Sequence, residues 1–283
     1  MRVGNIGGRA VLVVGDRALD IAEASGGRFP TSPRSLLEHW DEVLAWAPAA
    51  DWAAALPFEE SSLDAPIPNP DQVFAIGLNY KDHADEAGLP YPEHLVVFTK
   101  FQSSIGAPNT AVELPSGDVD YETELVVIIG KAGHKILETQ AWSHVAGVSV
   151  GQDYSERVVQ RRGPAPQFSL GKSYPNFTPY GPVIVSLDEL TDPDALSIIA
   201  ELEHVDGTRT TVQNGTSAHM IFSVPRTIAD LSQIVTLHPG DLIFTGTPAG
   251  VGLARGFTLQ PGQALRSTIE GVGSIRNAFV AAS

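Results

Sequence analysis

The apolar residues of this chain fall in short runs that glycine and proline interrupt. With 27 Gly and 21 Pro in 283 residues, this pattern favours many short strands over a helical bundle. Beyond residue 67, segments 79–87 and 221–234 look helical. They do not alternate regularly with the strands, so a doubly wound parallel sheet is disfavoured and a β-rich α+β fold is predicted. The expected strands are Val73–Ile76, Val96–Thr99, Leu125–Ile129, Val183–Val185, Ile198–Leu202 and Leu242–Thr245.

Residues 1–67 are expected to form a small N-terminal α/β domain. Ala10–Val14 is predicted to be a strand, and a second short strand should follow the next turn. A serine–proline pair typical of helix starts precedes the predicted helix over 34–46. Residues 61–71 hold three prolines in eleven residues, which predicts an extended linker to the main domain at 68–283.

Composition limits the partners of this protein. Its net charge of −15 repels phosphate backbones and argues against nucleic acid, while leaving room for a local cationic pocket that binds an organic anion. The lack of cysteine excludes disulfides, thiolate zinc sites and cysteine nucleophiles. No apolar window approaches the ~18 residues of a membrane helix, and the N-terminus does not resemble a signal peptide. We therefore expect a cytoplasmic protein with no membrane partner.

Acidic residues at strand ends are the first candidates for chemistry. Glu122 and Glu124 come just before an apolar run, and residues two apart on a strand point to the same face. Asp120 has the same spacing, and Asp153 adds a carboxylate after another apolar run. Such an all-oxygen set selects a hard cation such as Mg²⁺, Mn²⁺ or Ca²⁺. The alternatives are a solvated edge strand with alternating acids and an aspartate that caps a surface helix.

Nearby polar side chains could supply the other groups of such a site. His83 and Glu86 stand three apart in a predicted helix and would be neighbours, where a carboxylate orients an imidazole and raises its basicity, as a water-activating base requires. The alternative is an ordinary surface pair. Arg157 and Gln160 follow the acidic segment on roughly one helical face. Lys172, set among turn residues, is a candidate for binding a substrate carboxylate, or else a solvated side chain.

Two glycine motifs suggest other chemistry. Residues 245–252 follow a strand, and their backbone N–H groups could hold an anion. The motif lacks the lysine of a P-loop and the spacing of a dinucleotide fingerprint, so a nucleotide site is disfavoured. Gly147–Gly151 matches the G-x-S-x-G nucleophile elbow and makes Ser149 a remote alternative as a hydrolase nucleophile. Its valines also fit a plain buried strand.

Together these segments resemble the fumarylacetoacetate hydrolase family. The resemblance runs from about Val73 to Val272, and the small N-terminal unit also looks like the one that many bacterial members carry. It implies a mixed β-sandwich roll, commonly dimeric, with Mg²⁺ or Mn²⁺ as the cofactor, and we therefore expect a homodimer. The most specific stretches are Gly77–Tyr80, Tyr121–Leu125, Asp153–Gln160 and Leu237–Pro248.

The resemblance also implies roles for particular positions. It assigns metal ligands to Glu122, Glu124 and Asp153, a lid dyad to His83 and Glu86, a carboxylate-binding lysine to Lys172, and substrate contacts to Arg157, Gln160 and Thr247. Two departures flank the aspartate, because many relatives carry Asn and Val where this chain has Gln152 and Tyr154. These positions and the insert at 160–170 are expected to shape the pocket, which adds Tyr154 to the substrate-binding residues.

The resemblance implies a metal-dependent hydrolase that cleaves a carbon–carbon bond in a small anionic 2,4-dioxo acid, such as an acylpyruvate or a fumarylacetoacetate-like compound. The metal would stabilise the enolate that leaves. His83, oriented by Glu86, would deprotonate the attacking water, and Lys172 and Arg157 would bind anionic oxygens. Without a delivered water, the same site would decarboxylate oxaloacetate or isomerise an oxo-enoic acid. The dyad favours hydrolysis, and a non-catalytic binding protein is the remaining alternative.

Overall fold

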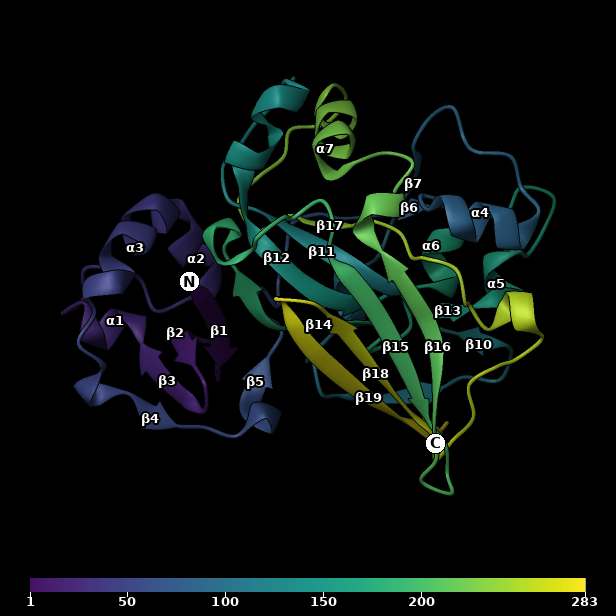
Figure 1. Ribbon diagram of the computed structural model, residues 1–283, viewed down its shortest axis with the longest axis horizontal. Helices are drawn as coiled ribbons and strands as arrows, with labels where there is room; N and C mark the ends of the chain where they lie inside the picture. Colours follow the sequence, from purple (N-terminus) through teal and green to yellow (C-terminus); the bar gives the residue numbers. More distant parts are fainter. Residues whose placement is uncertain (283) are drawn as a thin grey trace.

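The computed structural model describes residues 1–282 and shows two packed β-sheets with short helices around them (Figure 1). The long sheet runs in the order β4 (Leu56–Pro57), β3 (Arg17–Asp20), β2 (Arg9–Val14), β1 (Arg2–Ile6), β14 (Thr178–Val185), β12 (Val145–Gln152), β11 (Thr123–Ile129), β17 (Leu242–Phe244), β6 (Val73–Gly77) and β7 (Val96–Thr99), with β5 (Leu63–Asp64) beside β1 and β8 (Ile105–Gly106) beside β14. The second sheet runs β16 (Arg209–Thr216), β15 (Ser197–Glu203), β18 (Ala264–Ile269), β19 (Gly273–Ala281) and β9 (Ala111–Leu114).

A two-stranded ribbon and short helices complete the fold. The ribbon pairs β10 (Val119–Asp120) with β13 (Ser155–Glu156). The helices are α1 (Ile21–Ala24), α2 (Pro33–Leu36), α3 (Trp40–Trp46), α4 (Lys81–Ala87), α5 (Arg157–Gln160), α6 (Phe168–Gly171) and α7 (Val224–Ser232). Most strand pairs are antiparallel, but β17–β6, β14–β8 and β19–β9 are parallel. The prediction of a β-rich α+β fold with mixed sheets is confirmed.

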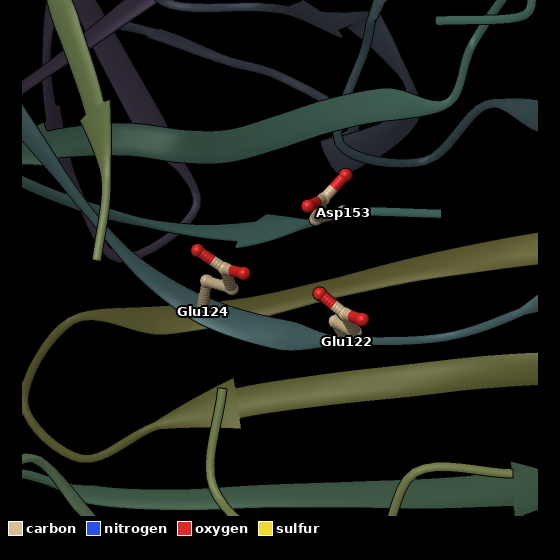
Figure 2. A group of neighbouring side chains, drawn as sticks. All are labelled: Glu122, Glu124 and Asp153. Carbon is tan, nitrogen blue, oxygen red and sulfur yellow. The ribbon is translucent and has the colours of Figure 1, made fainter. Parts of the chain in front are cut away.

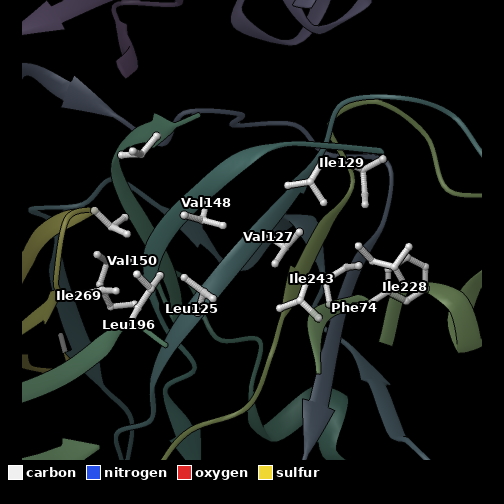
Figure 3. Packing of buried hydrophobic residues seen from close by; sticks show 14 of the residues in the cluster. Phe74, Leu125, Val127, Ile129, Val148, Val150, Leu196, Ile228, Ile243 and Ile269 are labelled. Carbon is white, nitrogen blue, oxygen red and sulfur yellow. The ribbon is translucent and has the colours of Figure 1, made fainter. Parts of the chain in front are cut away.

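Strand β11 lies at the centre of the core because both of its faces are buried. Leu125, Val127 and Ile129 point into the hydrophobic cluster between the two sheets (Figure 3). Val126 and Ile128 point the other way, into a cluster shared with the N-terminal helices. A strand covered on both faces needs a continuous apolar run, which explains why its sequence shows no alternation.

The second sheet covers the end of β11 that holds the acidic residues. In β15 the buried residues alternate with partly exposed ones, as in a strand that packs through one face. Its Ala200 and Leu202 belong to a third apolar cluster, together with Tyr121 and Tyr154. This cluster closes the core just beyond the carboxylates.

The N-terminal segment extends the long sheet. Strand β1 pairs antiparallel with β14, with Arg2 opposite Val185 and Val3 opposite Ile184. Strand β1 was not expected from the sequence, because Gly4 and Asn5 interrupt its apolar pattern. Asn5 is nevertheless buried, and its amide donates to the backbone of residue 65 at 2.8 Å.

The segment over 61–71, predicted to be an extended linker, is docked against the N-terminal strands. Strand β5 pairs with β1, and Ala65 and Ile67 are buried. The Tyr180 hydroxyl accepts from Ile67 N–H at 2.6 Å and donates to its carbonyl at 2.8 Å. These contacts satisfy backbone groups that an exposed linker would leave to water.

The predicted helices are present but shorter. The helix expected over 34–46 is divided into α2, a 3₁₀ turn and α3. Helix α4 begins at Lys81 because Asn79 is used elsewhere: its amide donates to the carbonyls of Phe222 and Thr245 at 3.1 and 2.8 Å. Across residues 1–282, no helix has the length and apolar character needed to cross a lipid bilayer.

Candidate metal centre and active-site cavity

The pairing of β11 with β12 brings a group of carboxylates together. Thr123 lies opposite Gln152, so Glu122 and Asp153, which flank this pair, meet at the same end of the sheet. The buried side chains of Glu122, Glu124 and Asp153 each offer one oxygen, and these three atoms lie within 4.8 Å of one another. Figure 2 shows the three side chains gathered between the neighbouring strands. The alternative of a solvated edge strand is wrong, because β11 is internal and buried.

Two lysine ammonium groups contact this cluster. Lys172 Nζ lies 2.6 Å from Asp153 Oδ2 and 2.8 Å from Glu122 Oε2. Lys100 Nζ donates to Asp153 Oδ1 and to the backbone carbonyl of Lys172. Burial opposes a charged Lys172, but Asp153 and Glu122 outweigh it and raise the pKa of this lysine. Burial lowers the pKa of Lys100, although Asp153 acts in the opposite direction.

Arg157 forms a second ion-paired group beside the first. Its guanidinium lies 2.5 Å from Asp120 Oδ2 and 2.8 Å from Glu122 Oε1, and it donates to Gln160 Oε1 at 2.9 Å. Burial alone would raise the pKa of Glu122, but the charges of Lys172 and Arg157 lower it to about 2. Asp120 therefore holds Arg157 and is not part of the carboxylate cluster.

Backbone N–H groups of the loop over 245–252 donate hydrogen bonds to carboxylate side chains of this protein. The contacts are Gly246 N–H to Glu124 Oε2 at 2.8 Å, Gly250 N–H to Glu86 Oε2 at 2.9 Å, and Gly252 N–H to Asp120 Oδ1 at 2.7 Å. At Gly250, φ is +108° and a Cβ would lie 2.1 Å from a backbone oxygen, so the position requires glycine. The loop does bind anions, as its sequence suggested, but these anions are side chains of other segments.

Buried amide side chains fix the backbone beneath the site. Gln152 Oε1 accepts from Glu122 N–H at 3.0 Å, and its Nε2 donates to Thr123 Oγ1 at 2.6 Å. Gln213 Nε2 donates to Thr247 Oγ1 at 2.8 Å, and this threonine donates in turn to Thr123 O at 2.8 Å. Gln152 therefore acts on the site through the backbone of its metal-ligand candidates, and not by lining the pocket.

A cavity of about 590 Å³ opens beside the carboxylate cluster, which contributes Glu122 to its lining. Its polar lining includes residues predicted from sequence, namely His83, Glu86, Glu122, Arg157, Gln160, Lys172 and Thr247. Most of the remaining lining is apolar and comes from β6, β7, the 160–170 insert and the loop after 250. The fold thus brings the predicted acid–base, anion-binding and carboxylate groups to one enclosed space.

The His83–Glu86 pair differs in detail from the expectation of a hydrogen-bonded dyad. His83 Nδ1 lies 3.8 Å from Glu86 Oε2, and this buried nitrogen has no hydrogen-bond partner among the described residues. The Glu86 oxygen accepts instead from Gly250 N–H. The pair is therefore adjacent and faces the cavity, and pairs of this kind often tighten only when substrate binds.

Two sequence expectations do not fit this geometry. The Tyr154 side chain points away from the cavity into the third apolar cluster, where its hydroxyl donates to Asn277 Oδ1 at 3.1 Å; it has no contact with the space that substrate would fill. Ser149 is fully buried in β12 and donates to the Val183 carbonyl at 2.6 Å. With its hydroxyl committed inside the sheet, Ser149 is not a nucleophile, and the elbow motif is a plain strand.

The donor set fits a divalent ion. Glu122, Glu124 and Asp153 would supply hard carboxylate oxygens, the ligand type preferred by Mg²⁺ and Mn²⁺. Oxygens on opposite sides of an ion with ligands at about 2.1 Å are about 4.2 Å apart, which agrees with atoms that lie within 4.8 Å of one another. A bound ion would add positive charge where three buried carboxylates already converge.

Lys100 is a site residue that the sequence did not lead us to expect. It directly follows the predicted strand 96–99, and a lysine at the end of an apolar run was the available signal. The side chain is buried, its ammonium contacts Asp153 from the side opposite Lys172, and its second bond holds the Lys172 backbone. Lys100 therefore positions both a candidate metal ligand and a candidate substrate-binding lysine.

Replacing Lys100 with methionine should destabilise the protein strongly, because it leaves a buried carboxylate with one cation fewer. Breaking a buried ion pair typically costs about 3–5 kcal/mol. We expect a lower melting temperature for the metal-free variant and a larger gain on adding Mn²⁺ than in the parent. Thermal unfolding with and without Mn²⁺ measures both. Lys131→Met, at an exposed position, should change neither the melting temperature nor its increase with Mn²⁺. If the melting temperature of Lys100→Met equals that of the parent, this ammonium is dispensable.

Fold and site together define a class of enzyme: a mixed β-roll with a buried Glu-x-Glu and Asp cluster beneath a cavity. The sequence model described as "Fumarylacetoacetate (FAA) hydrolase C-terminal" matches residues 72–280, and the chain belongs to the fumarylacetoacetate hydrolase family. It is 40% identical over 260 residues to human "Oxaloacetate tautomerase FAHD2A, mitochondrial", covering 89% of this chain and 81% of that protein.

Solved structures agree with this assignment. A Mycobacterium smegmatis protein provisionally called HpcE superposes with a TM-score of 0.92 and 51% identity, with 100% of both chains covered. Maleylpyruvate hydrolase from Sphingobium sp. SYK-6, in complex with manganese(II) and pyruvate, superposes with a TM-score of 0.80 and 26% identity, again over 100% of both chains. Hydrolase and tautomerase names thus both occur among proteins similar to this chain.

Proposed function

We propose that this protein is a divalent-metal-dependent hydrolase that cleaves a carbon–carbon bond in a small 2,4-dioxo acid. The observation that carries the proposal is the placement of His83 and Glu86 on the same cavity as Glu122 and Lys172. Delivery of water to a bound oxo acid requires a general base within reach of that water, and His83 lines the same cavity as Glu122 and Lys172. The manganese and pyruvate of the similar maleylpyruvate hydrolase support a metal and an oxo acid in this cavity.

Each charged or titratable residue of the cavity would have its own role in this reaction. A bound Mg²⁺ or Mn²⁺ would stabilise the negative charge that develops on the oxo-acid fragment. Arg157 and Lys172 would bind substrate oxygens, because both already present buried positive charge at the cavity floor. His83 would take a proton from water, and Glu86 would orient the imidazole. The apolar walls would exclude other water from the reacting groups.

Tautomerisation of oxaloacetate is the second candidate. The observation that favours it is the 40% identity to an oxaloacetate tautomerase. This reaction moves a proton between carbon and oxygen, and it would use His83 as the base without an attacking water. Both candidates need the same cations and carboxylates, so the substrate decides between them.

A panel of substrates tests the proposal. We expect acylpyruvates to be cleaved with added Mn²⁺ or Mg²⁺ and not after treatment with EDTA. Pyruvate and the released carboxylic acid report hydrolysis, while loss of the enol absorbance of oxaloacetate reports tautomerisation. Release of carbon dioxide from oxaloacetate reports decarboxylation. Turnover of oxaloacetate without cleavage of any acylpyruvate would replace the first candidate with the second.

A further inference from the structure

The cavity changes from polar to apolar along one line of side chains. At its floor, Lys172 Nζ lies 5.1 Å from the centre of the Phe98 ring. The Phe98 ring packs edge-on against Phe168, with centroids 5.6 Å apart. Both rings line the cavity, so a ligand whose anionic end reaches Lys172 would lay its other end along aromatic carbon.

The mouth of the cavity exposes more apolar surface. Leu89, Val96 and Leu253 line it and are 50%, 37% and 41% exposed. They come from segments far apart in the sequence, and all three face the same space. Apolar carbon gathered around a concave opening is typical of a ligand site.

The backbone of Leu78 independently indicates that the apolar wall of the cavity contacts a ligand. It lines the cavity with φ at +53°, a left-handed conformation that is rare and costly for a bulky residue. The next residue, Asn79, holds this backbone: its Oδ1 accepts from Phe222 N–H at 2.8 Å, and its amide donates to two carbonyls. The fold therefore maintains an unfavourable backbone that presents a leucine to the cavity.

Most of the positively charged side chains that line the cavity form ion pairs at its floor. Lys172 and Arg157 are ion-paired to Glu122. Arg161 is exposed at the rim and forms no ion pair with any described residue. Among the lysine and arginine side chains of the lining, a distal carboxylate would find only this solvated arginine outside an ion pair.

The size of the cavity also exceeds a short oxo acid. Its volume of about 590 Å³ lies within the range of about 300–1,000 Å³ that is typical of pockets for drug-sized ligands. A four-carbon dicarboxylic acid bound at the floor would leave the apolar part filled with water.

We infer that this outer part of the cavity binds an uncharged, apolar acyl chain, so that the preferred ligands are oxo acids with a medium-length aliphatic or aromatic tail. The inference deepens the proposed function and rests on its oxo-acid site at the floor. Each methylene that leaves water should improve binding about fourfold. A carboxylate at the far end of the chain should remove about tenfold of the gain in affinity.

Calorimetric titration of the Mn²⁺-loaded protein with oxo acids that lack a 4-oxo group tests binding apart from cleavage. The ligands are pyruvate, 2-oxononanoate and 2-oxononanedioate. We expect 2-oxononanoate to bind at least about a hundredfold more tightly than pyruvate and about tenfold more tightly than the diacid. Equal affinity for pyruvate and 2-oxononanoate, no binding of the latter, or preference for the diacid would overturn the inference.

Variants locate the effect. Phe168→Ala and Leu253→Asn should each weaken the binding of 2-oxononanoate about tenfold. The affinity for pyruvate should stay within about twofold of the parent value. Leu253 is exposed enough that its replacement should fold, which melting temperatures would verify. Arg161→Gln should leave the affinity for 2-oxononanoate unchanged. If the parent prefers the diacid and Arg161→Gln removes that preference, the rim binds a carboxylate instead of an apolar chain.

The corresponding dioxo acids separate this inference from the proposed function. If 2-oxononanoate binds as expected but 2,4-dioxononanoate is not cleaved, the tail site stands and the hydrolase proposal fails. If acetylpyruvate is cleaved but the longer acid neither binds nor reacts better, the hydrolase proposal stands and the tail site fails.

Discussion

Replacing Glu124 with glutamine is expected to remove most of the activity without weakening the metal-free protein. No lysine or arginine lies within 4.0 Å of its carboxylate among the described residues, and burial, followed by repulsion from Asp153 and Glu122, raises its pKa well above the ordinary value. Glutamine keeps an oxygen for the Gly246 N–H but removes the charge that would hold a metal. We expect kcat/KM to fall at least about 10²- to 10³-fold.

The stability of this variant should move in the opposite direction from its metal affinity. Removing a repelled, buried charge should leave the melting temperature of the metal-free protein unchanged or higher, while Mn²⁺ should no longer raise it. Calorimetric titration with Mn²⁺ and thermal unfolding measure the two effects. Glu138→Gln, at an exposed position, is the matched control. Parent-like Mn²⁺ affinity in Glu124→Gln, or full activity of the parent in EDTA, would contradict the metal centre.

The carboxylate cluster was predictable because it depends on short-range geometry. The two-residue period of a strand places Glu122 and Glu124 on one face, and Asp153 follows the apolar run that becomes the neighbouring strand. The same period explains the error at Tyr154. It stands next to Asp153 in an extended segment, so its side chain points to the other face, into the apolar cluster.

Lys100 was not predictable in this way, because its partner is distant in sequence. It meets Asp153 across 53 residues. In the sheet order, β11, β17 and β6 stand between β7 and β12, so neither the sequence nor the strand pairing announces this contact. Strand β1 was missed for a related reason. Its buried Asn5 is satisfied by the backbone of residue 65, so a polar residue that looks like a strand breaker is paired by tertiary contact.

The glycine loop shows how a motif can indicate the right chemistry and the wrong partner. Its N–H groups do bind anions, but three of them serve Glu124, Glu86 and Asp120. Nothing in the spacing of the motif distinguishes an internal carboxylate from a ligand phosphate. The loop thereby links the carboxylate cluster, the histidine pair and the Arg157 ion pair, and a change in it should affect all three.

Replacing His83 with alanine is expected to lower kcat for acylpyruvate hydrolysis by about 10²–10⁴, the usual cost of a lost general base. The imidazole lines the cavity beside Glu122 and forms no ion pair with the metal-ligand candidates. The fold and the binding of 2-oxo acids should therefore persist. Decarboxylation of oxaloacetate needs no attacking water, so its kcat should fall much less. Parallel measurements of kcat for both reactions, with calorimetric binding of pyruvate, separate these effects.

Glu86→Gln should weaken hydrolysis less than His83→Ala, because Glu86 orients the imidazole and takes no proton. Glutamine can still accept from Gly250 N–H through its amide oxygen, so the loop should stay in place. Steady-state kinetics of both variants should give this order, with His94→Ala, an exposed histidine nearby, unchanged. If His83→Ala hydrolyses acylpyruvates within a few-fold of the parent, the pair does not activate water and another group does. If both variants lose oxaloacetate tautomerisation as completely as hydrolysis, His83 moves protons at carbon, and the second candidate function gains the same base.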